Sequence, residues 1–301
     1  MKLVGGRAYD VRLEYFEGIV GASVELLWQS ADKDPMRRVA EVARGADIVI
    51  AAVGDGMGDE TEGADRASLS LPGRQDEIVR TAAAVNPKIV VITTSGAAVA
   101  MPWLDQVRAV LHGWFPGQEA GTAFTDLLFG DVSPSGKLPV TFPKRLEDEP
   151  GFGNFPGTDG KVAYQEGILV GYRWYDTRKI APLFPFGYGL SYTTFAYSGL
   201  KAGIDTVSFT VRNTGKRAGA EVAQVYAGLP AAADEPPKRL VAWEKVPLAP
   251  GEAKTITLKI EPKYLSIFNE QKDDWELLAG EYKIFVGGSS DNTPLTASVR
   301  R

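Results

Sequence analysis

Apolar residues at helical and at strand spacing alternate between residues 34 and 129. The first helix is expected to begin with Asp34 as N-cap and Pro35 at the first helical position, and to stop at Gly45. The next apolar run, ADIVIAAVG, has the length of a buried strand. Further elements are expected as a helix over 74–85, strands over 88–94 and 108–111, and a helix over 118–129. This alternation predicts a parallel sheet with helices on its faces.

The first 28 residues have a different pattern. Residues 9–15 and 23–28 alternate apolar and polar positions, and Glu17 and Gly18 stand where a turn would join them. This spacing is typical of a β-hairpin. Because a lone hairpin is only marginally stable in water, we do not expect this segment to form a domain by itself.

Proline, glycine and aromatic residues crowd residues 134–195 and leave little periodicity. Such a stretch is either disordered or packed over another surface by its aromatic side chains. Packing is favoured because disordered segments are poor in aromatic residues. Beyond Phe195, short strands recur at intervals of roughly 8 to 12 residues with Gly, Pro and Asn in the turns, which predicts a β-sandwich. The expected fold class is therefore α/β plus all-β.

Composition and charge narrow the classes of function. The chain has 301 residues, a net charge of −5 and no Lys/Arg cluster, which argues against nucleic acid and anionic membrane surfaces as partners. No run approaches the roughly 18 to 20 apolar residues of a membrane-spanning helix, and no signal segment opens the sequence. Since cysteine is absent, disulfide, thiolate and Cys-zinc chemistry are excluded, while the redox compartment stays open.

The segment with the clearest chemistry is the glycine-rich acidic loop over 54–74, directly after the predicted strand. It contains Glu60, Glu62 and Asp65, with Arg66 beside them. Ligands of open α/β sheets bind beyond the carboxyl ends of the strands, so carboxylates placed there indicate an active-site loop. Taken alone, the same residues would also suit a solvated surface turn.

Other motifs fit their functional interpretations poorly. The glycines at 54–58 follow G-x-G-x-G rather than the dinucleotide spacing, and acidic residues follow them. The segment 130–138 lacks the spacing and the Ser/Thr of a P-loop. His112 is the only histidine and no G-x-S-x-G elbow could partner it, so a buried structural role is expected. Glu119 and Glu166 are also interpreted as structural.

Four long motifs, in order, resemble the C-terminal half of a glycoside hydrolase family 3 β-glucosidase. They occupy 115–143, 164–176, 184–195 and 211–226, and the resemblance runs from about Asp34 to Val286. It implies an α/β-sandwich domain over 29–145, an aromatic connecting segment over 146–195 and a fibronectin type III-like β-sandwich over 196–301. Residues 1–28 resemble the last strands of an inserted protective-antigen-type sugar-binding β domain. The family's N-terminal barrel, which carries the aspartate nucleophile, is missing.

The resemblance also assigns site residues. The family's general acid/base is a glutamate before a glycine in patterns such as SEGYDR, and the match TEGADR places this role on Glu62, with Glu60 as runner-up. Ala64 replaces the tyrosine of that pattern. Asp65 and Arg66 are expected to bind substrate or to fix the loop by pairing with each other. Crowding by Glu60 and Asp65 would favour the protonated form of Glu62, as an acid catalyst needs.

The implied function is the C-terminal part of a retaining exo-β-glycosidase acting on a β-linked glucoside or oligosaccharide. Its active site would be completed by a barrel domain in cis or in trans, and the chain alone would be inactive. No cofactor and no metal are implied, and homo-oligomers are compatible with the pattern. The alternatives are a non-catalytic carbohydrate-binding or scaffold module and a complementing subunit of a split glycosidase. Localisation stays unknown, because any signal peptide would lie in the missing half.

Overall fold

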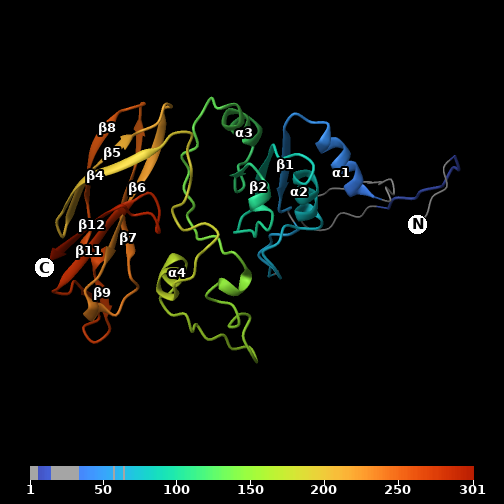
Figure 1. Cartoon of the computed structure of the whole chain (residues 1–301). Coiled ribbons are helices and arrows are strands. Elements are labelled where there is room, and N and C mark those ends of the chain that lie inside the picture. The colour runs from blue at the N-terminus through green and yellow to red at the C-terminus, as the bar shows by residue number, and fades with distance from the viewer. Residues whose placement is uncertain (1–5, 15–33, 57, 64) are drawn as a thin grey trace.

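The α/β part is built on a three-stranded parallel sheet. The computed structural model describes residues 6–14, 34–56, 58–63 and 65–301 (Figure 1). The strands are β1 (Val49–Gly54), β2 (Ile89–Thr94) and β3 (Ala109–His112), in the order β1-β2-β3 and parallel throughout. Each strand matches an apolar run in the sequence. The carboxyl ends of all three strands therefore lie at one edge of the sheet.

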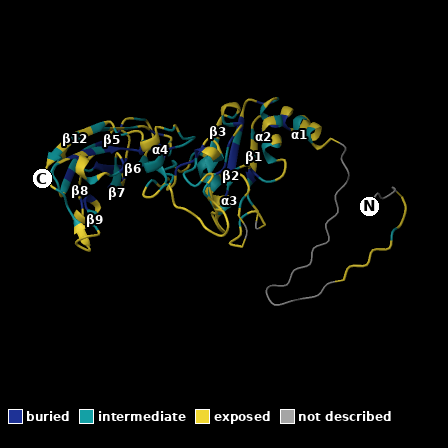
Figure 2. Cartoon of the chain, turned by 90° about the horizontal axis from the view of Figure 1, so that it is seen from below, coloured by how far each residue is buried: buried dark blue, intermediate teal, exposed yellow. Residues whose placement is uncertain are grey.

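Three helices flank this sheet. They are α1 (Pro35–Arg44), α2 (Gln75–Ala83) and α3 (Ala120–Phe129). The Asp34 side chain accepts a hydrogen bond from the Arg37 N–H at 3.0 Å, which confirms the predicted N-cap. Figures 1 and 2 show α1 and α2 on one side of the sheet and α3 on the other. The predicted α/β layers are thus confirmed.

A compact apolar core joins α2 to the sheet. Val79, Ile89 and Val91 are fully buried there, together with Trp103. The Trp103 indole N–H donates to Asp76 Oδ1 at 2.7 Å, so its one polar group is satisfied. Figure 2 shows β2 buried between its two neighbours, whereas β1 lies at the edge of the sheet. This core holds the ends of β1 and β2 in a fixed relation.

The predicted N-terminal hairpin lies mostly outside the described residues. Residues 6–14, which would contribute its first strand, contain no strand assignment. Residues 15–33, which include the expected turn and second strand, are outside the described part. The assignment of 1–28 to a sugar-binding β domain stays a prediction.

The aromatic connecting segment packs against both neighbouring layers at its ends. Phe142 is buried in the α/β core and forms an antiparallel bridge with Phe184. The Tyr172 ring lies 4.9 Å from that of Phe186 and 5.8 Å from that of Tyr226 in the sandwich, as centroid distances. The helical elements here are η2 (Leu146–Asp148) and α4 (Tyr172–Arg178). Packing is therefore the correct alternative for these ends of the segment.

The middle of this segment is different. Phe152, Phe155 and Tyr164 are exposed, and Tyr164 is 81% accessible. Ile168 and Val170 are exposed as well. We call residues 150–170 the aromatic arm, because within the described chain its large apolar side chains are left largely uncovered.

The C-terminal part is a β-sandwich, as the turn spacing predicts. One sheet has the order β12-β11-β6-β7 and the other β4-β5-β8, and β9 pairs with β10 in a separate hairpin. The strands are β4 (Phe195–Ala202), β5 (Thr206–Asn213), β6 (Gly219–Gly228), β7 (Arg239–Leu248), β8 (Ala253–Lys259), β9 (Ile267–Asn269), β10 (Asp274–Glu276), β11 (Glu281–Gly287) and β12 (Leu295–Arg300). Phe209, Val225 and Ile284 are fully buried between the sheets. The fold class, α/β plus all-β, is confirmed.

In the described part of the chain, none of the helices is long and apolar enough to cross a bilayer.

Candidate active-site loop

The acidic loop begins at a tightly packed strand end. The Gly54 N–H donates to Gln75 Oε1 at 2.6 Å, and the Gln75 amide donates back to the Gly54 carbonyl at 2.8 Å. A Cβ on Gly54 would lie 2.1 Å from the Thr94 carbonyl oxygen, so this position must be glycine. The loop therefore leaves β1 at a point fixed by both α2 and β2.

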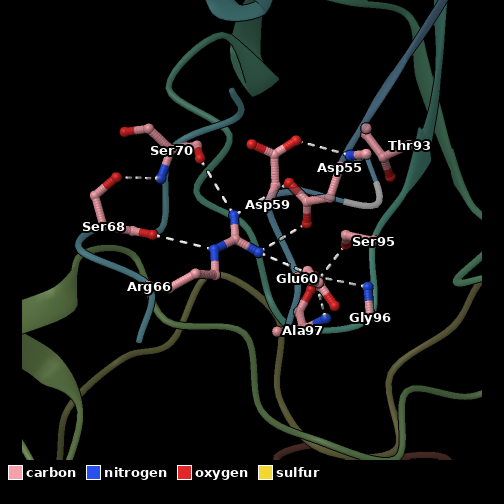
Figure 3. A network of polar contacts seen from close by, with 12 residues as sticks. Asp55, Asp59, Glu60, Arg66, Ser68, Ser70, Thr93, Ser95, Gly96 and Ala97 are labelled. Carbon is pink, nitrogen blue, oxygen red and sulfur yellow. Dashed lines mark hydrogen bonds and ion pairs between the residues drawn. The ribbon is translucent and has the colours of Figure 1, made fainter. Parts of the chain in front are cut away.

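Arg66 is the centre of a polar network in this loop (Figure 3). Its Nη1 lies 2.7 Å from Asp55 Oδ2 and 3.0 Å from Glu60 Oε1. Its remaining N–H groups bond the second oxygen of Asp55 and the carbonyls of Ser68 and Ser70, each at 3.3 Å. The expected pairing of Arg66 with Asp65 is wrong. The guanidinium instead bridges two carboxylates, because they lie at the strand end within reach of its fork.

Glu60 joins the loop to the turn after β2. Its Oε1 accepts the backbone N–H groups of Gly96 at 2.9 Å and Ala97 at 3.2 Å. A Cβ on Gly96 would lie 2.1 Å from Glu60 Oε2 and 2.8 Å from a ring carbon of Phe115. Glycine at this position leaves the room in which the Glu60 carboxylate lies.

The two bridged carboxyls differ in protonation. The Asp55 side chain is 0% exposed. Burial raises its pKa to about 6, and its hydrogen bond with Glu60 adds to the rise, whereas Arg66 opposes it. Burial also works to raise the pKa of Glu60, but the Asp55 carboxyl, the Gly96 and Ala97 N–H groups and Arg66 together lower it. Glu60 is therefore the first of the pair to ionise as the pH rises.

Glu62 and Asp65 lie outside this network. Both are exposed, and neither makes a hydrogen bond or an ion pair within the described part of the chain. Of the four predicted site residues, the structure thus brings Glu60 and Arg66 together and leaves Glu62 and Asp65 at the surface. Sequence reasoning missed the part of Asp55 in this network, although its position as the first residue after an apolar strand was a usable signal.

His112 ends β3 at the same edge of the sheet. Its Nδ1 lies 2.9 Å from the Thr93 hydroxyl, and its ring packs against Trp114 and Phe142 at centroid distances of 4.3 and 5.2 Å. Burial lowers the pKa of His112 to about 4, so the imidazole is neutral at pH 7. These contacts agree with the predicted structural role.

The two motif glutamates occupy different environments. Glu119 is exposed at the N-cap position of α3 and makes no side-chain capping bond. The Oε2 atom of Glu166 is buried without a hydrogen-bond partner among the described residues. Within the same residues, no group of three or more His, Cys, Asp or Glu side chains is arranged to hold a metal ion.

The chain matches two family descriptions. Residues 3–192 match the glycosyl hydrolase family 3 C-terminal domain, and residues 221–290 match the fibronectin type III-like domain. The first match covers most of the α/β part and the connecting segment. The resemblance predicted from the motifs is confirmed.

Curated relatives and solved structures agree with these matches. The chain is 46% identical to beta-glucosidase B of Emericella nidulans over 92% of its own length and 35% of the relative. It is 40% identical to thermostable beta-glucosidase B of Acetivibrio thermocellus, over 100% of the chain and 40% of the relative. Its fold matches the GH3 beta-glucosidase of Bifidobacterium adolescentis with a TM-score of 0.85 and 39% identity, over 90% of this chain and 41% of that one. A glucose complex of the Kluyveromyces marxianus beta-glucosidase matches with a TM-score of 0.86 and 41% identity, over 91% and 34% of the two chains. The chain therefore spans 34% to 41% of the proteins that it matches here.

Proposed function

Because this chain belongs to glycoside hydrolase family 3, we propose that it supplies the general acid/base, Glu62, to the active site of a retaining exo-β-glycosidase of the β-glucosidase type. The observation that carries the proposal is the difference between the contacts of the two glutamates in the acidic loop. Glu60 is held by Arg66 and two backbone N–H groups, whereas the neighbouring Glu62 is exposed and unpaired within the described chain.

This difference favours Glu62 over Glu60 as the acid. A general acid must hold a proton near the operating pH and release it to the leaving oxygen. The contacts of Glu60 favour its ionised form, and three of them use its Oε1 atom, so it is poorly suited to give a proton. Asp55 holds its proton more tightly, but its side chain is 0% exposed and cannot reach a substrate. Glu62 is the remaining glutamate of the loop with a free approach.

The reaction would follow double displacement. Glu62 protonates the departing oxygen while an aspartate of the barrel attacks the anomeric carbon and forms a glycosyl-enzyme. Glu62 then removes a proton from the incoming water, which releases the sugar with its anomeric configuration retained. The two carboxyls would stand about 5 to 5.5 Å apart, as this mechanism requires. No residue of the described chain is assigned as the nucleophile.

The barrel would come from the part of the relatives that this chain does not span, or from a separate polypeptide. The aromatic arm supports a docking role. Phe152, Phe155 and Tyr164 are exposed although the segment is rich in apolar side chains, and such a patch is usual at an interface. A β-linked glucoside or oligosaccharide is the proposed substrate, because relatives are named beta-glucosidases and three matched structures hold glucose.

An aryl β-glucoside assay, with and without a barrel domain supplied in trans, tests this function. The purified chain should show no hydrolysis above background, since it lacks the nucleophile and the positioning that is worth up to about 7 to 11 kcal/mol. Adding the barrel should restore turnover, and Glu62→Gln should remove it. Asp47→Asn is the matched control, because Asp47 is an exposed carboxylate outside this loop. Turnover by the chain alone that is abolished by Glu62→Gln would refute the division of the active site.

A further inference from the structure

We propose that Asp55, Glu60 and Arg66 form a positioning unit that fixes the loop of Glu62 across the ends of β1 and β2. The inference rests on the proposed function only in taking Glu62 as the residue that is positioned. The unit itself is defined by contacts in this chain and can be tested without any activity.

The donor groups of Arg66 are fully used. A guanidinium has five N–H groups, and Arg66 makes five hydrogen bonds. Nη1 binds Asp55 and Glu60, Nη2 binds Asp55 and the Ser70 carbonyl, and Nε binds the Ser68 carbonyl. A lysine has three donors on a single nitrogen and cannot reproduce this fork. A positive charge alone is not enough at this position, so the unit requires arginine.

The acceptors of Arg66 come from separate parts of the fold. Asp55 continues β1, and its N–H donates to the Thr94 carbonyl of β2 at 2.9 Å. Glu60 is bound to the turn after β2 through Gly96 and Ala97. Arg66 joins these two points to residues 68–70 on the far side of the loop (Figure 3). Three segments are thus locked together by one side chain.

Glu62 lies inside the short loop that this unit closes. Glu60 and Arg66 are joined at 3.0 Å and bracket residues 61–65. Both bracketing side chains are mostly buried, with 20% and 22% of their side-chain surface exposed. Glu62 therefore stands two positions after one held side chain and four positions before the other, which limits the range of positions open to its carboxyl. A displacement of about 1 Å in a catalytic group can cost about 10²-fold in rate.

The charge of the unit depends on pH. Two ionised carboxyls beside one guanidinium would leave a net negative charge on Asp55, which water does not reach. Asp59 is the other acidic group drawn beside them, and its Oδ2 accepts the Gly56 N–H at 2.8 Å (Figure 3). Burial raises the pKa of Asp55. Asp55 therefore takes up a proton more readily than an exposed aspartate as the pH falls, and the protonated side chain would donate to Glu60.

The first test uses the isolated 301-residue chain and nuclear magnetic resonance of its backbone amides. Arg66→Lys and Asp55→Ala should speed hydrogen exchange at Gly96 and Ala97 by at least 10-fold and shift their resonances. Asp65→Asn serves as the control without effect. Unchanged protection of Gly96 and Ala97 in Arg66→Lys and Asp55→Ala would overturn the unit.

The second test uses the enzyme reconstituted with its barrel and asks whether the unit acts through Glu62. Arg66→Lys should lower kcat/KM, which reports the glycosylation step, by about 10²-fold for an alkyl glucoside, with little change in kcat/KM for a dinitrophenyl glucoside, whose leaving group needs no proton. In a Glu62→Ala background the same substitution should add less than a 3-fold loss. Equal losses in both backgrounds would overturn positioning of Glu62. Failure of the proposed function would be seen separately, as a Glu62→Ala variant with wild-type dependence on the leaving group.

Discussion

Replacing Gly96 by alanine is a direct way to test how Glu60 is held. The added Cβ would lie 2.1 Å from Glu60 Oε2 and 2.8 Å from the Phe115 ring, so the carboxylate has to leave its place. It would lose the N–H groups of Gly96 and Ala97 as partners, and its ion pair with Arg66 would be displaced. The backbone at Gly96 has no left-handed φ, so the effect would come from these side-chain contacts and not from backbone strain.

The size of the effect follows from the bonds lost. Hydrogen bonds to charged groups contribute about 1.5 to 3 kcal/mol each. Since Glu60 is still 20% exposed and can turn to water, we expect the pair to contribute about 2 to 4 kcal/mol in total. At 1.4 kcal/mol per factor of ten, opening of this part of the fold should become about 30 to 1000 times more frequent.

Hydrogen exchange measured by mass spectrometry, on peptides that cover 54–70 and 89–99, reports this opening directly. It suits the chain better than one melting temperature, because a chain with more than one domain need not unfold in a single step. Gly58→Ala is the matched control, since a Cβ there has no neighbour within 4 Å. Combining Gly96→Ala with Glu60→Ala should cost less than the sum of the single variants, as the clash is then removed.

Two outcomes would refute this account. Exchange in Gly96→Ala that equals wild type would mean that the Glu60 contacts add no stability to the loop. Strict additivity in the double variant would mean that the added methyl group acts on something other than Glu60.

Three further expectations can be checked separately. In the reconstituted enzyme, Glu62→Ala should keep a burst with dinitrophenyl glucoside followed by slow turnover, and azide should restore turnover and yield a β-glycosyl azide; rescue of Glu60→Ala instead would move the assignment. Burial holds the pKa of His112 at about 4, below its ordinary 6.5, so the stability that the neutral imidazole contributes is present above pH 6.5 and falls by up to about 3 kcal/mol as the pH drops towards 4. His112→Phe should flatten this part of the plot of unfolding free energy, measured in urea, against pH. An unchanged slope would contradict the prediction. The isolated chain should bind a hydrophobic dye through the aromatic arm, and Phe155→Ser with Tyr164→Ser should reduce the signal; a monomeric wild-type chain without dye binding would speak against an uncovered arm.

Local signals were enough to predict the helices and strands of the α/β part. The Asp34 cap and the apolar run before Gly54 depend on neighbours a few residues away, and the structure has both where they were expected. The β-sandwich could be predicted equally well from the sequence, because strand alternation and turn residues repeat over a short period.

The contacts of the loop were harder to predict. Asp65 adjoins Arg66 in sequence, but Asp55 and Glu60 are eleven and six residues away and are brought to it by the strand end. The partners of Glu60, at Gly96 and Ala97, are backbone groups more than 30 residues further along, and their residue types carry no signal for such a contact. The exposure of the aromatic arm likewise depends on what covers it, which composition does not encode.

The paired hydrogen bonds between Gly54 and Gln75 hold the two ends of the acidic loop together. They tie the residue where the loop starts to the residue where α2 begins, so the ends stay together whatever lies between them. Doubling the length of a closed loop costs only about 0.6 kcal/mol in chain entropy. Insertions at Gly58 would lengthen the loop outside the stretch from Glu60 to Ser70 that Arg66 connects, and because a Cβ at Gly58 meets no atom within 4 Å, the sheet would keep its register at small cost in stability.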